Sequence, residues 1–197
     1  MQLLLLFCYP ILVHLAVYLE TPTLYIPAII VLTSGVLYKG LKQKNVAEWL
    51  IFLGILVSTI ICHAWNVAIY ILYLPPILIT SIIFSSFALS LRKGRVPLVT
   101  DIGEKSRGPL TQQMVDYTTR VTQFWALMLG LMLINTLSLT FYASPELWSL
   151  FTNVINYITI GAIFIGEFLY RRFRFKNHNH PSFTDYLKIV LNTKPNK

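Results

Sequence analysis

The chain has 197 residues, of which 55% are hydrophobic and 12% charged, and its mean hydropathy is +0.63. This composition excludes an ordinary soluble domain and is typical of an integral membrane protein. The net charge of +8 does not indicate nucleic-acid binding, because the basic residues lie beside apolar segments, as membrane orientation signals do. We therefore expect one integral membrane domain spanning residues 1–197.

Six apolar segments are predicted to cross the membrane, and all but the second reach the roughly 17–25 helical residues that a bilayer core about 30 Å thick needs. The first lacks the positive start and the small-residue cleavage site of a signal peptide, so we interpret it as a membrane helix. The second is short and contains Pro27, which favours a short or tilted span, with a re-entrant loop as the alternative. The predicted spans are about 2–19, 24–38, 47–64, 67–91, 121–143 and 147–170.

The distribution of Lys and Arg predicts the orientation of these spans. With six spans, every basic residue falls on one side of the membrane, and the opposite connections contain none. The positive-inside rule then places both termini, a loop at 92–120 and a tail at 171–197 in the cytoplasm. The basic positions are Lys39, Lys42, Lys44, Arg92, Lys93, Arg95, Lys105, Arg107, Arg120, Arg171, Arg172, Arg174, Lys176, Lys188, Lys194 and Lys197.

The fourth span contains the pair Pro75-Pro76, which removes two backbone donors from the helix. The carbonyls of Ile71 and Leu72 are therefore expected to lack their usual partners. A neighbouring helix or a water can satisfy such groups at a kink, or they can line a binding cavity, as in transporters.

Polar residues within the sixth span are candidates for a site, because polar groups are costly inside a bilayer. At 100° per residue, Ser149, Asn153, Asn156 and Glu167 fall on one stripe of the helix. The asparagine side chains can form hydrogen bonds to other helices, or they can contact a bound molecule. Glu167 either pairs with Arg171, four residues later, or closes a polar cavity and binds a headgroup or a proton.

Histidines offer a second set of candidates. His14 in the first span is either a packing residue or a general base. His63 is predicted near the outer interface with Glu146, and Trp65 and Trp148 are assigned to the aromatic belt of that interface. No spacing of these residues supports a catalytic site, and the chain has no common nucleotide-binding, hydrolase or metalloprotease motif.

Metal and redox chemistry find little support in the sequence. His178 and His180 give only weak support for a metal site, because no further ligands follow at a zinc-like spacing. Cys8 and Cys62 lie in apolar spans near opposite faces, so we expect free thiols. We assign no catalytic residue, cofactor or metal.

Two polar segments form a basic cytoplasmic face. The 92–120 loop has six basic and three acidic residues, and the 171–197 tail has seven basic residues and one acidic residue. This charge either only fixes topology or also attracts lipid headgroups or an acidic partner. The candidate contacts are Arg92, Lys93, Arg95, Arg120, Arg171 and Arg172.

Local patterns predict two further helices in these segments. From Thr111, a suitable cap, the chain is free of Gly and Pro, which predicts a helix continuous with the fifth span. In the tail, PSFTDYLKIVL has the spacing of a short amphipathic helix at 182–191. That helix would lie on the membrane surface or dock onto a partner.

Several segments of the sequence carry a resemblance to a known family. Among them are YLPPILI, RKGRVPLVT, VDYTTRVTQFWALM and the run from ELWSLF to RRFRF. The chain resembles an uncharacterised family of small bacterial inner-membrane proteins encoded in aryl-polyene and related fatty-acid-synthase-like gene clusters. Members have been labelled as ketosynthases or as a DNA gyrase component, and this sequence supports neither label. The resemblance implies a role beside ketosynthases, acyl carrier proteins and acyltransferases in the bacterial inner membrane.

The resulting hypothesis is a non-enzymatic component of a lipid biosynthesis system that anchors the cytosolic machinery or passes its product to the membrane. Its partners would be the bilayer and an acyl carrier protein or synthase subunits. The alternative is a small lipid or polyene transporter using Pro75-Pro76 and the polar stripe of span six. A second alternative is an integral acyltransferase using His14 or His63.

Overall fold

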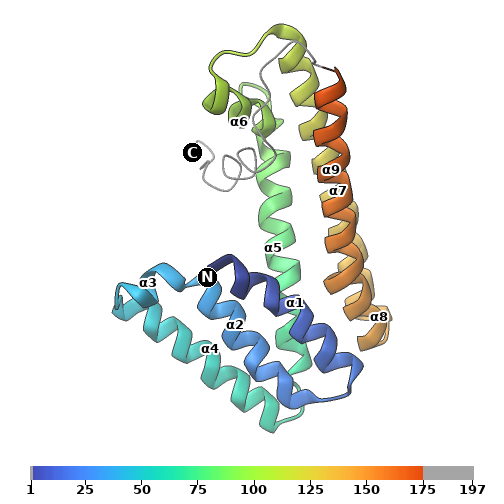
Figure 1. The fold of residues 1–197 in the computed structure, drawn as a ribbon. Coiled ribbons are helices and arrows are strands. Elements are labelled where there is room, and N and C mark those ends of the chain that lie inside the picture. Colours follow the sequence, from blue (N-terminus) through green and yellow to red (C-terminus); the bar gives the residue numbers. More distant parts are fainter. Residues whose placement is uncertain (1, 175–197) are drawn as a thin grey trace. The chain divides into compact units, whose positions relative to one another are not determined.

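The computed structural model describes residues 2–174, apart from the side chains of Leu3 and Arg107, and all its regular elements are helices (Figure 1). The expected all-α class is therefore confirmed for this part of the chain. The predicted amphipathic helix at 182–191, together with His178 and His180, lies outside the described residues. The elements are α1 (Gln2–Tyr18), η1 (Pro22–Leu24), α2 (Tyr25–Val36), α3 (Tyr38–Lys42), α4 (Val46–Ala64), α5 (Ile69–Ser90), α6 (Leu98–Arg107), α7 (Gln112–Tyr142), α8 (Pro145–Leu150), the π-helix η2 (Phe151–Ile155) and α9 (Asn156–Arg174).

Four helical segments are long and apolar enough to cross a membrane: α4, α5, α7 and the run Pro145–Arg174 formed by α8, η2 and α9. They indicate a membrane-associated protein. The two N-terminal apolar helices are shorter, since α1 has 17 residues and α2 has 12. At 1.5 Å per residue, α2 is about 18 Å long, which is less than a typical bilayer core.

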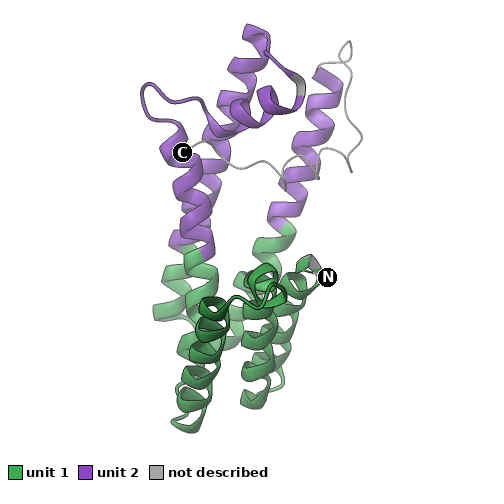
Figure 2. Ribbon diagram, turned by 90° about the vertical axis from the view of Figure 1, so that its left-hand side faces the viewer, with its two compact units in different colours: residues 1–78, 135–158 green, residues 79–134, 159–197 purple. Residues whose placement is uncertain are grey.

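The chain divides into two compact units (Figure 2). Unit 1 comprises Met1–Leu78 and Asn135–Ile158, and unit 2 comprises Ile79–Ile134 and Thr159–Lys197. Helices α5, α7 and α9 each contribute residues to both units. Each unit has its own interior.

The core of unit 1 is built mainly from α1, α2 and α8. Small residues such as Ala16 and Ala28, both completely buried, let the helices approach closely. Trp148 is also completely buried, with its ring centroid 4.5 Å from that of Tyr73. The prediction that Trp148 belongs to the aromatic belt is therefore wrong. Its position on α8, directly after the turn at Ser144, points it into the core, whereas Trp65 is 74% exposed.

The proline pair lies within α5, which continues through it from Ile69 to Ser90. The carbonyl of Leu72, which loses its usual helical donor at Pro76, accepts a hydrogen bond of 3.3 Å from the hydroxyl of Tyr9 on α1. A neighbouring helix thus satisfies this group, in agreement with one of the two interpretations of the pair. Both Tyr9 and Leu72 are buried.

Unit 2 corrects the expectation of a loop at 92–120. Residues Leu98–Arg107 form α6, an amphipathic helix that the sequence reasoning did not predict. The helix expected from Thr111 is confirmed, because α7 runs from Gln112 to Tyr142 and the Thr111 carbonyl accepts from the amides of Met114 and Val115. The segment is therefore mostly helical.

Candidate functional site

Helix α6 is held against α7 by threonine hydroxyls. Thr100 and Thr118 share a hydrogen bond of 2.7 Å between their Oγ1 atoms, and both side chains are buried. One turn further along α7, Thr122 Oγ1 accepts from the amide of Val99 at 3.2 Å and donates to the carbonyl of Thr118. These bonds fix the face of α6 that points toward α7.

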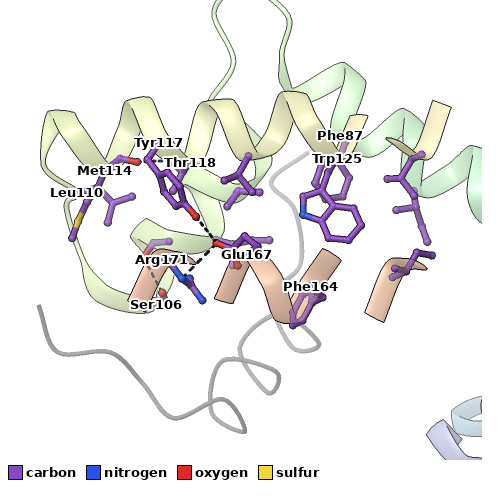
Figure 3. A pocket seen from close by; sticks show the side chains of 17 residues that line it. Phe87, Ser106, Leu110, Met114, Tyr117, Thr118, Trp125, Phe164, Glu167 and Arg171 are labelled. Atoms are coloured by element: carbon purple, nitrogen blue, oxygen red, sulfur yellow. Dashed lines mark hydrogen bonds and ion pairs between the residues drawn. The ribbon is translucent and has the colours of Figure 1, made fainter. Parts of the chain in front are cut away.

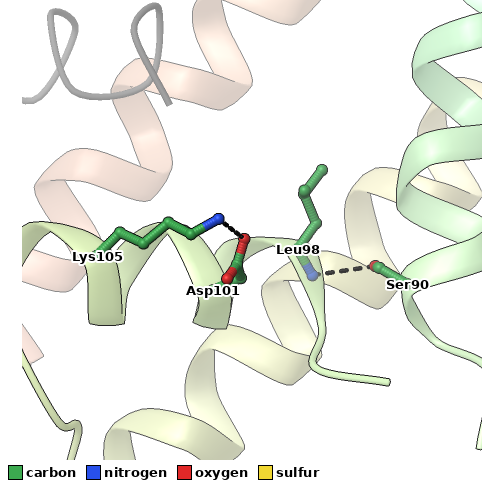
Figure 4. Close-up of polar contacts among 4 residues, drawn as sticks. All are labelled: Ser90, Leu98, Asp101 and Lys105. Carbon is green, nitrogen blue, oxygen red and sulfur yellow. Dashed lines mark hydrogen bonds and ion pairs between the residues drawn. The ribbon is translucent and has the colours of Figure 1, made fainter. Parts of the chain in front are cut away.

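The N-terminus of α6 is capped from a distance. Pro97 at the cap position offers no side-chain hydrogen bond. Instead, Ser90 at the end of α5 accepts from the amide of Leu98 at 3.0 Å, as Figure 4 shows. On the exposed side of the helix, Lys105 pairs with Asp101 at 2.7 Å. Side chains of α5 and α7 therefore satisfy amides that a local cap usually satisfies.

A cavity of about 210 Å³ lies within unit 2, lined by α5, α6, α7, α9 and Leu110 (Figure 3). Its walls are mainly apolar and include Phe87 from α5, Trp125 from α7 and Phe164 from α9. Lining residues on α7 extend from Met114 to Leu129, which corresponds to about 22 Å of helix. Apolar cavities favour apolar occupants over water, and the stretch of wall around Phe87, Trp125 and Phe164 meets that condition.

The cavity has a polar group in its wall, centred on Glu167. Its Oε1 atom accepts from the Tyr117 hydroxyl at 3.1 Å and lies 3.5 Å from Nε of Arg171 (Figure 3). The predicted ion pair of Glu167 with Arg171 is confirmed. Arg171 also lies 5.9 Å from the ring centroid of Phe168. The carboxylate is thus compensated by a cation and a hydroxyl donor, as a charge in a mostly buried place requires.

Sequence reasoning missed Tyr117, which completes this group. The residue was included in a helix, but no local signal connected it with Glu167, fifty residues later. Only the packing of α7 with α9 brings the two together. The aromatic ring of Tyr117 also stacks on that of Tyr170, with centroids 5.9 Å apart.

The predicted stripe on span six is divided between two local networks. In unit 1, Ser149 Oγ lies 3.2 Å from Nδ1 of His14 and accepts from Asn153 Nδ2 at 3.3 Å. Glu167 belongs to the network of unit 2. Asn156 is half-buried and makes no side-chain hydrogen bond within residues 2–174. The π-helix η2 lies between Ser149 and Asn156, so the constant 100° step does not describe this stretch.

The contact between His14 and Ser149 resembles part of a nucleophilic site, but its environment does not. Ser149 is completely buried, whereas an acyl-transfer nucleophile needs access to its donor. Nearby polar atoms, Trp148 Nε1 and Thr152 Oγ1, are buried without a hydrogen-bond partner in the described part of the chain. His63, half-buried near the end of α4, has no hydrogen bond to Glu146 among these residues. The geometry therefore gives the acyltransferase alternative no support.

A second, polar cavity of about 300 Å³ also lies in unit 2, between α7 and α9. It is open at the surface, because all its lining residues except Tyr117 are exposed. The two arginines that line it, Arg120 and Arg174, are exposed. Of the other basic candidates, Arg92, Lys93 and Arg95 are exposed in the turn between α5 and α6. Arg172 is exposed on α9.

The described residues contain no group of three or more His, Cys, Asp or Glu side chains that could hold a metal ion. Cys8 and Cys62 are both half-buried free thiols. No protein-family model matches the chain, and searches of curated proteins and of solved structures find no match either.

Proposed function

We propose that the protein is a non-enzymatic inner-membrane component that accepts a long acyl or polyene chain from cytosolic lipid synthesis and passes it to the bilayer. The observation that carries the proposal is the cavity of about 210 Å³, apolar along its walls and with one charge-compensated polar group. Such a lining accommodates a hydrocarbon chain. The resemblance to the family found in aryl-polyene clusters supplies the synthetic context.

The proposed topology has six membrane helices with both ends of the chain in the cytoplasm. Helices α1 and α2 pack together and are joined by a short turn at Leu19–Leu24. Such a pair returns the chain to the side from which it entered, even if the short helices cross only part of the bilayer. Lys39, Lys42 and Lys44 then remain on the same side as the other basic residues, as the positive-inside rule requires.

In this topology the cavity residues Tyr117 and Glu167 lie toward the cytoplasmic boundary, while Trp125 and Leu129 lie deeper. An acyl chain delivered from the cytosol would meet α6 and the polar group before the apolar walls. The basic residues around this boundary favour an acidic acyl carrier protein as the delivering partner. Association of this kind depends on charge and weakens as salt increases.

Photolabelling of the full-length protein in mild detergent tests the proposal. The probe is a long-chain fatty acid with a diazirine near the end of its chain. We expect crosslinks concentrated on cavity residues such as Phe87, Trp125 and Phe164. Crosslinks spread evenly over the exposed apolar faces of the helices, with no enrichment at the cavity, would overturn chain binding.

Two substitutions that fill the cavity sharpen the test. Val121→Phe on α7 and Ile160→Phe on α9 place a ring in the space, so labelling should fall to background in both. Leu127→Phe on α7 is the matched control, because Leu127 is 62% exposed and does not line the cavity. Equal labelling of all three variants would contradict the proposal.

The partner is tested separately. Acyl carrier protein should be retained with the purified membrane protein at low salt and released at high salt. Complete absence of carrier protein at low salt would remove this partner from the proposal, whereas chain binding is measured by the photolabel alone.

A further inference from the structure

The polar cavity of unit 2 borders the same tyrosine as the apolar one. Tyr117 lines both: its hydroxyl donates to Glu167 at the wall of the apolar cavity, and its ring stacks on Tyr170, which lines the polar cavity. The two spaces are therefore adjacent at this side chain. The polar cavity has a volume of about 300 Å³ and is bounded by Gln113, Asp116, Tyr117, Arg120, Tyr170 and Arg174.

Charge in the polar cavity favours an anion. Arg120 and Arg174 carry two positive charges, and Asp116 carries the one opposing carboxylate. That carboxylate already accepts from Gln112 Nε2 at 3.0 Å. Guanidinium groups present planar pairs of donors that match phosphate and carboxylate oxygens. The ion pairs of residues 2–174 involve neither arginine, and both side chains are exposed.

The neighbouring carboxylate does not oppose this assignment. Glu167 lies at the wall of the apolar cavity, where Arg171 and the Tyr117 hydroxyl compensate its charge. Its effect on an anion beside Arg120 and Arg174 is therefore reduced. In the proposed topology Arg120 directly precedes the fifth span and Arg174 lies one helical turn beyond the sixth, which is near the depth of lipid headgroups.

We propose that the cavity at Arg120 and Arg174 binds the phosphate of an anionic, single-chain amphiphile whose hydrocarbon chain occupies the adjacent apolar cavity. This inference rests on the proposed function for the position of the chain, and it adds the substrate class. A phosphate on a lipid and a free phosphate share the same chemistry, and the experiment separates them.

The experiment measures competition against the diazirine fatty acid on the full-length protein. Lysophosphatidic acid and monoacylglycerol with the same acyl chain are the two competitors, since they differ only in the phosphate. We expect lysophosphatidic acid to compete about tenfold better, a ratio that corresponds to about 1.4 kcal/mol. The preference should decrease with increasing salt, because the arginines are exposed.

Variants that remove charge show which arginines cause the preference for lysophosphatidic acid over monoacylglycerol. In Arg120→Gln/Arg174→Gln the two competitors should become equal, while labelling by the fatty acid should persist at a lower level because its carboxylate also loses the guanidinium donors. Arg92→Gln/Arg95→Gln removes the same charge from the turn between α5 and α6, outside the cavity, and should keep the preference. Arg120→Lys/Arg174→Lys retains the charge without the planar donors and should fall between the two.

Binding of radiolabelled inorganic phosphate completes the design. Equal competition by both lipids in the unsubstituted protein, with labelling intact, would overturn the headgroup site and leave the proposed function standing. A preference lost equally in both double glutamine variants would also overturn it, since general charge would then explain it. Phosphate binding that requires Arg120 and Arg174, without any labelling by the fatty acid, would overturn the lipid headgroup and the proposed function together, leaving a free-phosphate site.

Discussion

The core of unit 1 and the cavity of unit 2 use similar residues, but they differ in how completely side chains fill the interior. In unit 1, Trp148 is fully buried and the polar atoms of His14, Ser149 and Asn153 bond to one another. In unit 2, the polar group of Glu167 borders about 210 Å³ of space. A polar residue in an apolar helix therefore marks a candidate site only where a cavity lies beside it.

The largest expected effect comes from truncating one tryptophan in each unit. Trp148→Ala should destabilise the protein by about 3–5 kcal/mol, because the ring is packed on all sides. Trp125→Ala should lie at or below the lower end of that range, because the ring already faces a cavity. Denaturant unfolding in detergent measures both. A larger loss for Trp125→Ala would contradict the contrast between a filled and an open interior.

An intermediate effect is expected from the threonines that hold α6. Thr122→Val leaves the partly buried amide of Val99 without its acceptor, which costs about 1–3 kcal/mol. Hydrogen exchange at Leu98 and Val99 should become faster, since the start of α6 opens. Thr119→Val is the control, because the Thr119 hydroxyl donates only to Val115 in its own helix. Unchanged exchange in Thr122→Val would show that α6 does not depend on this bond.

The smallest effect is expected from Tyr9→Phe in unit 1. The Leu72 carbonyl would lose its donor beside the proline pair, at a cost of about 1 kcal/mol, the lower end of the range for an unpaired buried group, because the bond is long at 3.3 Å. Tyr142→Phe serves as the control, because Tyr142 is 91% exposed. Equal unfolding midpoints for the two variants would mean that the carbonyl finds another donor.

Sequence patterns predicted the helical class, the four long apolar helices among six proposed spans, and the extension of α7. They also gave the pair of Glu167 with Arg171 as one of two interpretations of Glu167. These features depend on local information: hydropathy, an uninterrupted run of helix formers and a spacing of four residues. A neighbouring helix was one of the expected sources of a donor for the freed Leu72 carbonyl. The donor itself, Tyr9, lies sixty-three residues away in the chain, so the sequence could not identify it.

Features that depend on distant residues were missed. Helix α6 begins after Pro97, which offers no side-chain cap, and its amides bond instead to Ser90 and Thr122. The burial of Trp148 was likewise decided by packing with α1 and α5. The polar stripe assumed regular α-helical geometry, and the π-helix Phe151–Ile155 departs from it.

The distant caps of α6 also impose an order of assembly. Helices of about ten residues are marginally stable alone in water, and α6 has ten. Its amides find acceptors only when the end of α5 and the first turns of α7 are already in place. Thr122 follows α6 in the chain, so we expect α6 to gain its full stability only when α7 is present. We therefore expect the wall of the apolar cavity that α6 forms to depend on the prior docking of α5 and α7.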